Sequence, residues 1–85
     1  MKSIEAALLS LRQQSIARGF AGRLEDFDIK LCEDNCTVSI WAFYALDEPL
    51  MAHVVLPEPI DPTAFDPAPY YSEAVNFAAA RPTLH

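Results

Sequence analysis

Glycine is scarce in this sequence, and its scarcity excludes one class of site. Gly19 and Gly22 are the only glycines among the 85 residues. A loop that wraps nucleotide phosphates needs several closely spaced glycines, because only glycine lets the backbone come close to the phosphate oxygens. The sequence therefore contains no phosphate-binding loop of that kind.

Long hydrophobic runs are also absent. A membrane-spanning helix needs about 20 consecutive, mostly apolar residues, and no stretch of this chain approaches that length. The apolar segment at 4–11 is short and contains Glu5, which is not typical of a secretory signal. We therefore expect a cytoplasmic protein without a membrane partner, in which the two cysteines stay reduced.

Basic residues almost disappear after the first third of the chain. Residues 31–85 have a net charge of −7, with Arg81 as the only cation against the acids Glu33, Asp34, Asp47, Glu48, Glu58, Asp61, Asp66 and Glu73. The whole chain has a formal net charge of −6. Such a surface repels phosphate backbones, so we expect no direct binding of nucleic acid. The charge favours solubility. Our second hypothesis for function is that it belongs to an acidic inhibitor or a nucleic-acid mimic encoded by a mobile element.

The apolar residues that are present first recur with the period of a helix. One stripe holds Ile4, Ala7, Leu8, Leu11 and Ser15, and Leu9 and Ile16 widen its apolar side. Gly19 follows, in the place of the left-handed residue that often ends a helix. The pattern predicts a helix over residues 3–18.

Three runs with a period of two follow this helix. Side chains alternate over residues 26–33, 36–45 and 50–56, which predicts three strands. The links between these runs are short, and short links are typical of an antiparallel meander.

Proline dominates the segment after the third strand. Five of the seven prolines lie within residues 57–69, which predicts a proline-rich strap rather than a strand or a long helix. Asp61 and Asp66 each precede a proline, a pair typical of the start of a helical turn. A last helix is predicted over residues 70–80, with Tyr71, Ala74, Val75 and Ala78 on one side.

Together these elements predict one α+β domain over residues 1–85. Its order is α-β-β-β-α, with a three-stranded antiparallel meander and both helices on one face of the sheet. This order is similar to that of double-stranded RNA-binding domains. The last helix of those domains begins with a basic cluster, whereas here the corresponding place holds Asp66, Tyr70, Tyr71 and Glu73. The resemblance is therefore one of order, and it implies no RNA binding.

The two cysteines bracket a turn, in the stretch CEDNC at 32–36. A two-residue type I′ turn at Asp34 and Asn35 would place Leu31 opposite Val38, and it would point the two thiols to opposite sides of the sheet. A three-residue turn would face the thiols toward each other, but it would move the apolar side chains of one strand to the wrong face. Each misplaced side chain costs about 1.5–3 kcal/mol. We therefore predict the first register and two unpaired thiols.

Few residues have the chemistry of a reaction centre. The spacing C-x₃-C supplies two metal ligands, and His53 and His85 are the only histidines that could complete a site. We therefore predict neither a metal site nor a cofactor. His53 lies in the middle of a predicted strand, without a motif for a nucleophile nearby. An enzyme that uses His53 with a carboxylate or thiol is our third hypothesis, and we predict no catalytic residue.

The strands carry a second apolar face, opposite the one expected to meet the helices. With Tyr44 opposite Leu50, this face pairs Trp41 with His53, Phe43 with Met51, and Ser39 with Val55. Contiguous exposed apolar surface usually marks an interaction site, and Trp and Met are common in interfaces. Alternatively, the strap at 57–69 folds over this face with Ile60 and Phe65 and buries it.

The function predicted first is that of a small, acidic, non-enzymatic protein-interaction module. It would act as a homodimer or dock on a protein partner through the second sheet face. The predicted partner-binding residues are Trp41, Phe43, Met51, His53 and Val55.

Overall fold

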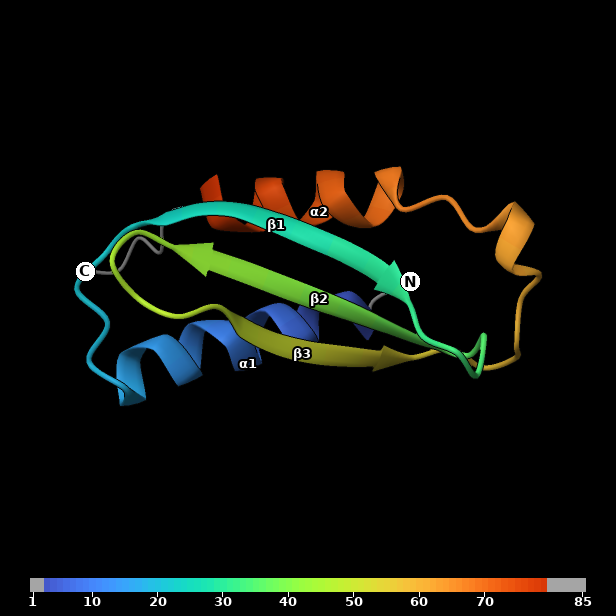
Figure 1. Cartoon of the computed structure of the whole chain (residues 1–85), viewed down its shortest axis with the longest axis horizontal. Helices are drawn as coiled ribbons and strands as arrows, with labels where there is room; N and C mark the ends of the chain where they lie inside the picture. Colours follow the sequence, from blue (N-terminus) through green and yellow to red (C-terminus); the bar gives the residue numbers. More distant parts are fainter. Residues whose placement is uncertain (1–2, 80–85) are drawn as a thin grey trace.

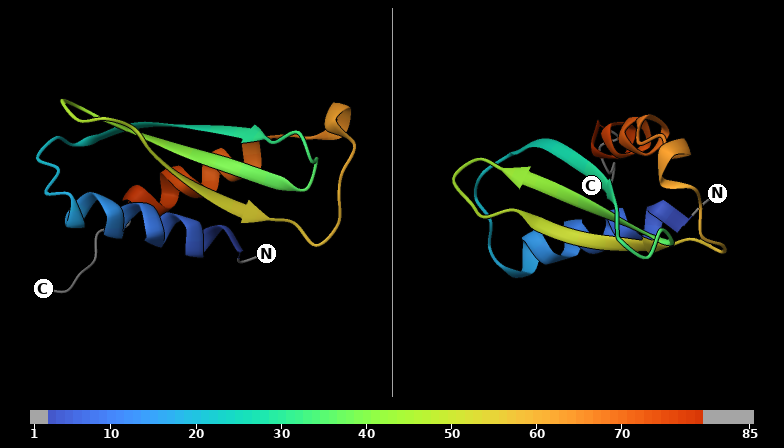
Figure 2. Two further views of the ribbon diagram at one scale, coloured as in Figure 1. Left: turned by 60° about the horizontal axis from the view of Figure 1, so that its bottom comes forward. Right: turned by 45° about the vertical axis from the view of Figure 1, so that its right-hand side comes forward.

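The computed structural model describes residues 3–79. Its elements are α1 (Ser3–Ala17), β1 (Leu24–Leu31), β2 (Thr37–Tyr44), β3 (Leu50–Val55), the short 3₁₀ helix η1 (Pro62–Ala64) and α2 (Ala68–Ala79). The strands form one antiparallel sheet in the order β1-β2-β3. Figure 1 shows α1 along β3 and α2 along β1, and Figure 2 shows both helices on the same side of the sheet. The predicted α+β fold with the order α-β-β-β-α is confirmed.

Helix α1 covers the sheet with the stripe that its sequence predicts. Ile4, Ala7, Leu8 and Leu11 are buried, and Ser15 is half-buried. Leu9 and Ile16 are exposed, because they lie on the far side of the helix and do not widen the buried stripe as predicted. The helix ends at Gly19, with a φ of +69°; the Phe20 N–H donates to the Ser15 carbonyl and the Gly19 N–H to the Ile16 carbonyl. This is the Schellman arrangement, which confirms the predicted glycine cap.

Strands β1 and β2 pair in the predicted register. Leu31 lies opposite Val38, Ile29 opposite Ile40 and Phe27 opposite Ala42, so apolar side chains meet at each core position. The strand β1 begins at Leu24 and ends at Leu31, two residues earlier at each end than predicted. Glu25 is an extra residue, because Leu24 and Asp26 face the consecutive residues Tyr44 and Phe43. The extra residue shifts the alternation by one position, so Leu24 packs against the buried cluster and not on the face of Asp26.

The turn between β1 and β2 differs from the predicted type. A type I′ turn needs positive φ at both central residues, and in this turn Asn35 has a φ of 58° while Asp34 does not. Residues 33–36 lie between the paired Cys32 and Thr37, whose backbone groups bond at 2.8 Å. The Asp34 carboxylate closes the turn by accepting the N–H groups of Cys36 and Thr37, both at 2.9 Å. Hydrogen bonds to the Asp34 carboxylate therefore stabilise this turn, which does not have the type I′ backbone conformation.

The register of β2 with β3 is two residues away from the prediction. Leu50 lies opposite Ala42 rather than Tyr44, and Met51 lies opposite Trp41 rather than Phe43. The end of β2 is held toward β1 instead, because the Ala45 N–H donates to the Arg23 carbonyl at 2.9 Å. A shift by two residues keeps every side chain on its predicted face.

The strap passes around the end of the sheet and returns on the helix side (Figure 2). Asp61 caps η1 by accepting the Thr63 N–H, and Asp66 accepts the Ala68 N–H at the start of α2. Both aspartates therefore act as their Asp-Pro pairs predict. Ile60 and Phe65 pack against the buried cluster on the helix side, so the alternative in which they bury the second sheet face is wrong.

Helix α2 begins two residues before the prediction, at Ala68, because Asp66 can bond its first turn. Its inward face is also rotated relative to the prediction. Ala74 is buried and Phe77 is half-buried, whereas Tyr71 and Val75 are exposed. The helix lies beside β1 rather than flat under the sheet, so only a narrow stripe of it reaches the core. The predicted end at residue 80 lies outside the described residues.

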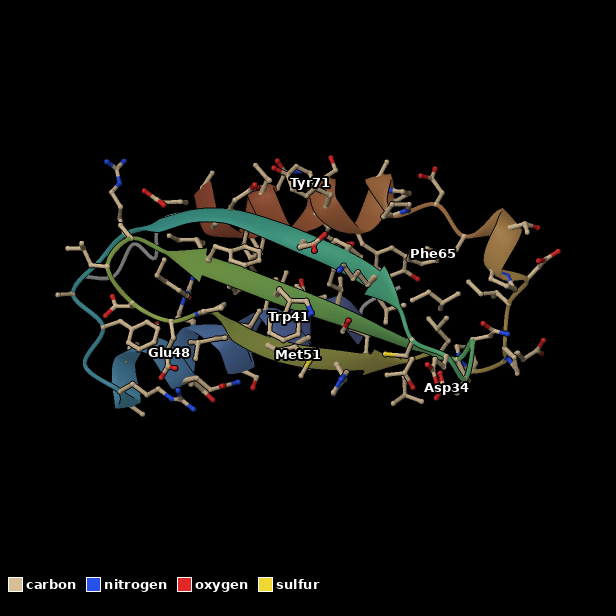
Figure 3. The ribbon with its side chains drawn as sticks, viewed as in Figure 1. Asp34, Trp41, Glu48, Met51, Phe65 and Tyr71 are labelled. Carbon is tan, nitrogen blue, oxygen red and sulfur yellow. The ribbon has the colours of Figure 1, made fainter. Side chains whose placement is uncertain are left out.

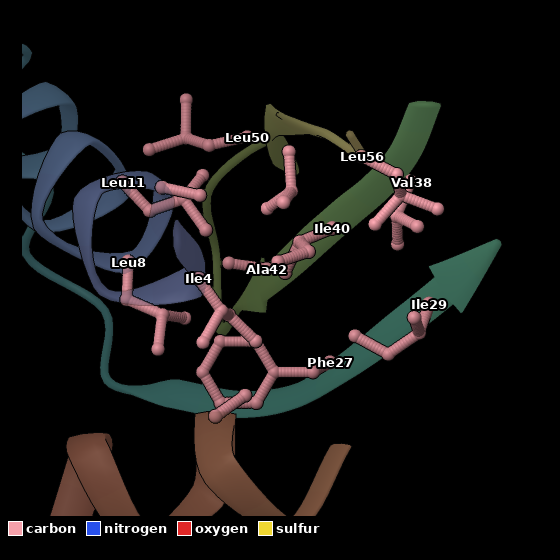
Figure 4. Close-up of a cluster of buried hydrophobic side chains, with 13 residues drawn as sticks. Ile4, Leu8, Leu11, Phe27, Ile29, Val38, Ile40, Ala42, Leu50 and Leu56 are labelled. Carbon is pink, nitrogen blue, oxygen red and sulfur yellow. The ribbon is translucent and has the colours of Figure 1, made fainter. Parts of the chain in front are cut away.

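The hydrophobic core lies between the sheet and the helices (Figure 4). Val38, Ile40 and Ala42 of β2 are fully buried, because β2 is the central strand and both helices lie over the same face of the sheet. Figure 4 shows Leu8 of α1 and Phe27 of β1 pointing into this space. Within residues 3–79, no helix is both long enough and apolar enough to cross a membrane.

Candidate functional site

The face of the sheet away from the helices is the candidate functional site, and we call it the outer face. Alternate residues of each strand point to it: Asp26, Asp28 and Lys30 of β1, Ser39, Trp41 and Phe43 of β2, and Met51, His53 and Val55 of β3. Figure 3 shows the side chains of Trp41 and Met51 in front of the strands, with both helices behind them. The strand pattern thus brings all five predicted partner-binding residues onto one surface.

Three of these five residues form the centre of the outer face. Trp41 and Met51 are direct cross-strand partners and are half-buried against each other's strands. Phe43 follows on β2 and is 37% exposed. Such a cross-strand pair of large apolar side chains stabilises the sheet, yet its outer surface remains in contact with solvent.

The other two residues lie farther along β3. His53 is exposed and faces Ser39, and Val55 is 71% exposed and faces Thr37. The predicted pairing of His53 with Trp41 is therefore wrong, although His53 does lie on the predicted face. Ser39 is only 7% exposed and its hydroxyl donates to the Lys30 carbonyl at 3.3 Å. The part of the outer face around His53 and Ser39 is thus more polar than its centre.

A row of charges borders the outer face along β1. Asp28 lies opposite Trp41, and Lys30 lies opposite Ser39. The Lys30 ammonium is 3.7 Å from the Asp28 carboxylate, and both side chains are largely exposed. An exposed pair of this kind contributes little to stability. Its position leaves an apolar centre with a charged margin, which is the usual anatomy of a protein interface.

Asp26 and Tyr71 form a polar contact at the border of this face that the sequence did not suggest. The Tyr71 hydroxyl donates to Asp26 Oδ1 at 2.7 Å, and the Phe27 N–H donates to the same oxygen at 2.8 Å. These two donors, the hydroxyl first, lower the pKa of Asp26, and the carboxylate raises the pKa of Tyr71. The helical periodicity predicted that Tyr71 faces the core, so the sequence provided no reason to expect this contact.

The two cysteines occupy opposite sides of the sheet, as the register predicts. Cys32 pairs with Thr37, while Cys36 packs against the buried cluster and its thiol donates to the Leu56 carbonyl at 3.2 Å. The two thiols are not bonded to each other. Within residues 3–79, no group of three or more histidine, cysteine and acidic residues is arranged to hold a metal ion. His85 lies outside the described residues.

The acidic residues are distributed over the molecule rather than collected on one surface. They lie in both turns of the sheet, in β1, in the strap and in α2. Each of Asp26, Asp34, Asp47, Asp61 and Asp66 accepts a backbone N–H. Many of the carboxylates therefore stabilise the local backbone of turns and helix starts.

A small cavity of about 200 Å³ lies on the helix side of the sheet, away from the outer face. It is lined mainly by apolar side chains of α1, α2 and the strands, among them Leu11, Leu24 and Phe77. The Arg12 guanidinium lies 4.6 Å from the centre of the Phe77 ring, a cation–π contact that joins the two helices. This cavity is smaller than typical ligand sites, which measure roughly 300–1,000 Å³. Two further pockets, which are more open, lie beside Tyr71 and measure about 350 and 370 Å³.

Comparisons with protein-family models, with curated proteins and with solved structures gave no match. The outer face and its surroundings are therefore the features that point to a function.

Proposed function

We propose that this protein is a small interaction module that docks on a protein partner through its outer face. One observation carries the proposal: the apolar centre formed by Trp41, Phe43 and Met51 has no cover among residues 3–79. A sheet that needed only solubility would place polar side chains at these positions. Aromatic and methionine side chains are enriched at interfaces, where they contribute a large part of the binding energy.

The margin of the outer face indicates the chemistry of the partner. Asp26 and Asp28 border the apolar centre, and the chain as a whole has a net charge of −6. A complementary partner would present an apolar patch with basic residues at its edge. The partner is thus a protein of neutral or basic surface, and the interaction takes place in the cytoplasm.

This arrangement supports docking better than the other two hypotheses. An acidic mimic of nucleic acid would gather its carboxylates on one surface, whereas here they lie in separate turns and caps. An enzyme centred on His53 would benefit from a carboxylate or thiol beside the imidazole. The cross-strand neighbour of His53 is Ser39, whose hydroxyl is engaged by the Lys30 carbonyl.

The test is capture of partners by the wild-type chain and by a variant of the outer face. Trp41→Ser combined with Phe43→Ser should remove the apolar centre, while Leu46→Ser is the matched control, since Leu46 is 96% exposed at a loop tip. We expect the double variant to lose at least about tenfold in affinity for the captured protein, and the control to keep it. Circular dichroism checks that both variants are folded.

Trp41 also provides an optical test, because it is the only tryptophan in the chain. Its fluorescence should shift to shorter wavelength when a purified partner covers the outer face. A partner that binds without any change in this emission, or that binds the double variant equally well, would overturn the proposal.

A further inference from the structure

The two edges of the sheet are protected to very different degrees. Natural sheets shield their edges with charges, bulges or a covering helix, because an unpaired strand can add a strand from another chain. The edge at β1 has all three devices: the charged residues Asp28 and Lys30, the bulge at Glu25, and helix α2 alongside (Figure 1). Even the outward N–H of Phe27 is used, because Asp26 accepts it.

The edge at β3 has a helix alongside, α1, but lacks the charged residues and the bulge (Figure 1). The segment Leu50–Val55 contains no proline and no aspartate, glutamate, lysine or arginine, and its pairing with β2 is regular. The Leu56 N–H donates to the carbonyl of its cross-strand partner Cys36. Because every second residue of an antiparallel strand bonds to the same neighbour, the backbone groups of Leu50, Ala52 and Val54 also bond to β2. The N–H and C=O groups of Met51, His53 and Val55 therefore point away from the sheet. Among residues 3–79, no strand pairs with them.

We propose that β3 pairs with β3 of a second copy of this chain, antiparallel, around a two-fold axis at His53. In this register the two His53 residues face each other, and Met51 of one copy faces Val55 of the other on the outer face. Ala52 meets Val54 on the core face, so apolar side chains oppose apolar ones on both sides. Every outward backbone group from Met51 to Val55 then has a partner. A shift by one residue would put core and outer side chains on the same face.

The layer of helices allows this pairing. Helix α1 lies under β3, on the side remote from α2 (Figure 2). Its contact with α2 includes Arg12, which stacks on Phe77. Helical geometry places Ser10 and Gln14 on the opposite flank of α1, toward the β3 edge, where the Gln14 amide donates to the Ser10 hydroxyl at 3.2 Å. This polar flank of α1 would face the same flank of the second copy, so the two-layer arrangement continues across the axis.

The pairing uses the backbone edge of β3 and does not depend on the apolar centre around Trp41, although the side chains of Met51, His53 and Val55 lie on the outer face. The dimer would join two three-stranded sheets into one continuous sheet, with both outer faces on the same side. Each Trp41 would remain free to meet a partner. A protein that fails to dock through Trp41 would still dimerise through β3, and the two proposals fail separately.

The first test combines solution mass with amide exchange on the wild-type chain. Sedimentation equilibrium should show twice the mass of one chain as concentration rises. Residue-resolved hydrogen exchange should then show that the amides of Met51, His53 and Val55 become protected with the same concentration dependence. A chain that stays monomeric, or a dimer in which these amides still exchange freely, would overturn the proposal.

The second test removes one outward donor without touching the ladder to β2. Val55→Pro deletes the N–H that would bond the second copy, and its place at an edge is one that proline tolerates. Val55→Thr, which keeps both the N–H and the β-branched shape, is the control. We expect Val55→Pro to raise the dissociation constant at least about tenfold and Val55→Thr to leave it within a few fold. A folded Val55→Pro variant that dimerises like wild type would refute the pairing.

A charge variant covers the case in which Val55→Pro does not fold. His53→Lys would place two ammonium groups opposite each other at the axis, where like charges repel. Leu46→Lys adds the same charge at an exposed loop tip and serves as the control. The monomer should predominate only for His53→Lys, and equal dimerisation of the two variants would count against the axis.

Discussion

Gly22→Ala tests how the end of the β2–β3 hairpin is held. A Cβ on Gly22 would lie 1.5 Å from the Ala45 carbonyl oxygen and 2.6 Å from its carbon, both backbone atoms. Ordinary contacts between such atoms are about 3.5–4.0 Å, so one of the two segments must move by about 2 Å. Gly22 is therefore required for the close approach of two backbones, and its φ lies outside the left-handed range.

That movement would break the two contacts that hold the loop after β2 against the chain before β1. These are the bond from the Gly22 N–H to Asp47 Oδ2 and the bond from the Ala45 N–H to the Arg23 carbonyl, each 2.9 Å long. A neutral hydrogen bond contributes about 0.5–1.5 kcal/mol and one to a charged group about 1.5–3 kcal/mol. We expect Gly22→Ala to lower the free energy of unfolding by about 2–4 kcal/mol.

Thermal unfolding by circular dichroism measures this loss. For a domain of this size, 1 kcal/mol corresponds to about 4–8 °C in Tm, so a loss of about 2–4 kcal/mol should lower Tm by about 8–32 °C. Gly19→Ala is the matched control: Gly19 has a φ of +69° and nothing within 4 Å of the added Cβ. Its cost is backbone strain alone, about 1–2 kcal/mol. The reasoning is refuted if Gly22→Ala unfolds at the wild-type temperature or loses less stability than Gly19→Ala.

Three further predictions concern the core and the polar contacts. Ile40→Ala should lower the free energy of unfolding by about 2–5 kcal/mol, because Ile40 is fully buried in the central strand, whereas Val55→Ala should change it little; urea titration compares the two. The Cys36 N–H and the Thr37 hydroxyl lower the pKa of Asp34 below its ordinary value of 3.8. A folded-state pKa below the unfolded value stabilises the fold above that unfolded value and ceases to do so as pH falls through the folded pKa. Wild-type protein should therefore lose more stability in acid than Asp34→Asn does, and equal acid profiles would contradict this assignment. Tyr71→Phe should raise the pKa of Asp26 toward 3.8, measured by NMR titration of its carboxyl carbon, and an unchanged pKa would show that the hydroxyl does not bond it in solution.

The α+β order and one half of the sheet follow from the sequence because their signals are local. The apolar stripe from Ile4 to Leu11 and the glycine after it contain the information for α1. The alternation on each side of the CEDNC turn determines the β1–β2 register, since any shift by one residue would expose Ile29 and Leu31. The alternation in β3 determines in the same way which of its side chains face the core. It places Met51 on the outer face, as the alternation in β2 places Trp41 there.

The β2–β3 register, the rotation of α2 and the path of the strap were decided by contacts between distant parts of the chain. Two registers that differ by two residues bury nearly the same side chains, so the periodicity of the sequence does not distinguish them. The choice depends on Gly22 and Asp47, which hold the end of β2 near β1. Likewise, α2 turns Ala74 and Phe77 inward because it lies at the edge of the sheet beside β1.

Which elements form and which side chains share a face can thus be read from the sequence, because these depend on periods of two and 3.6 residues. That the strap leaves the outer face open depends instead on packing between distant parts of the chain. Ile60 and Phe65 are apolar enough for either face, and they join the larger core on the helix side, where more apolar surface is removed from water. The exposed centre around Trp41 is a consequence of that choice of side.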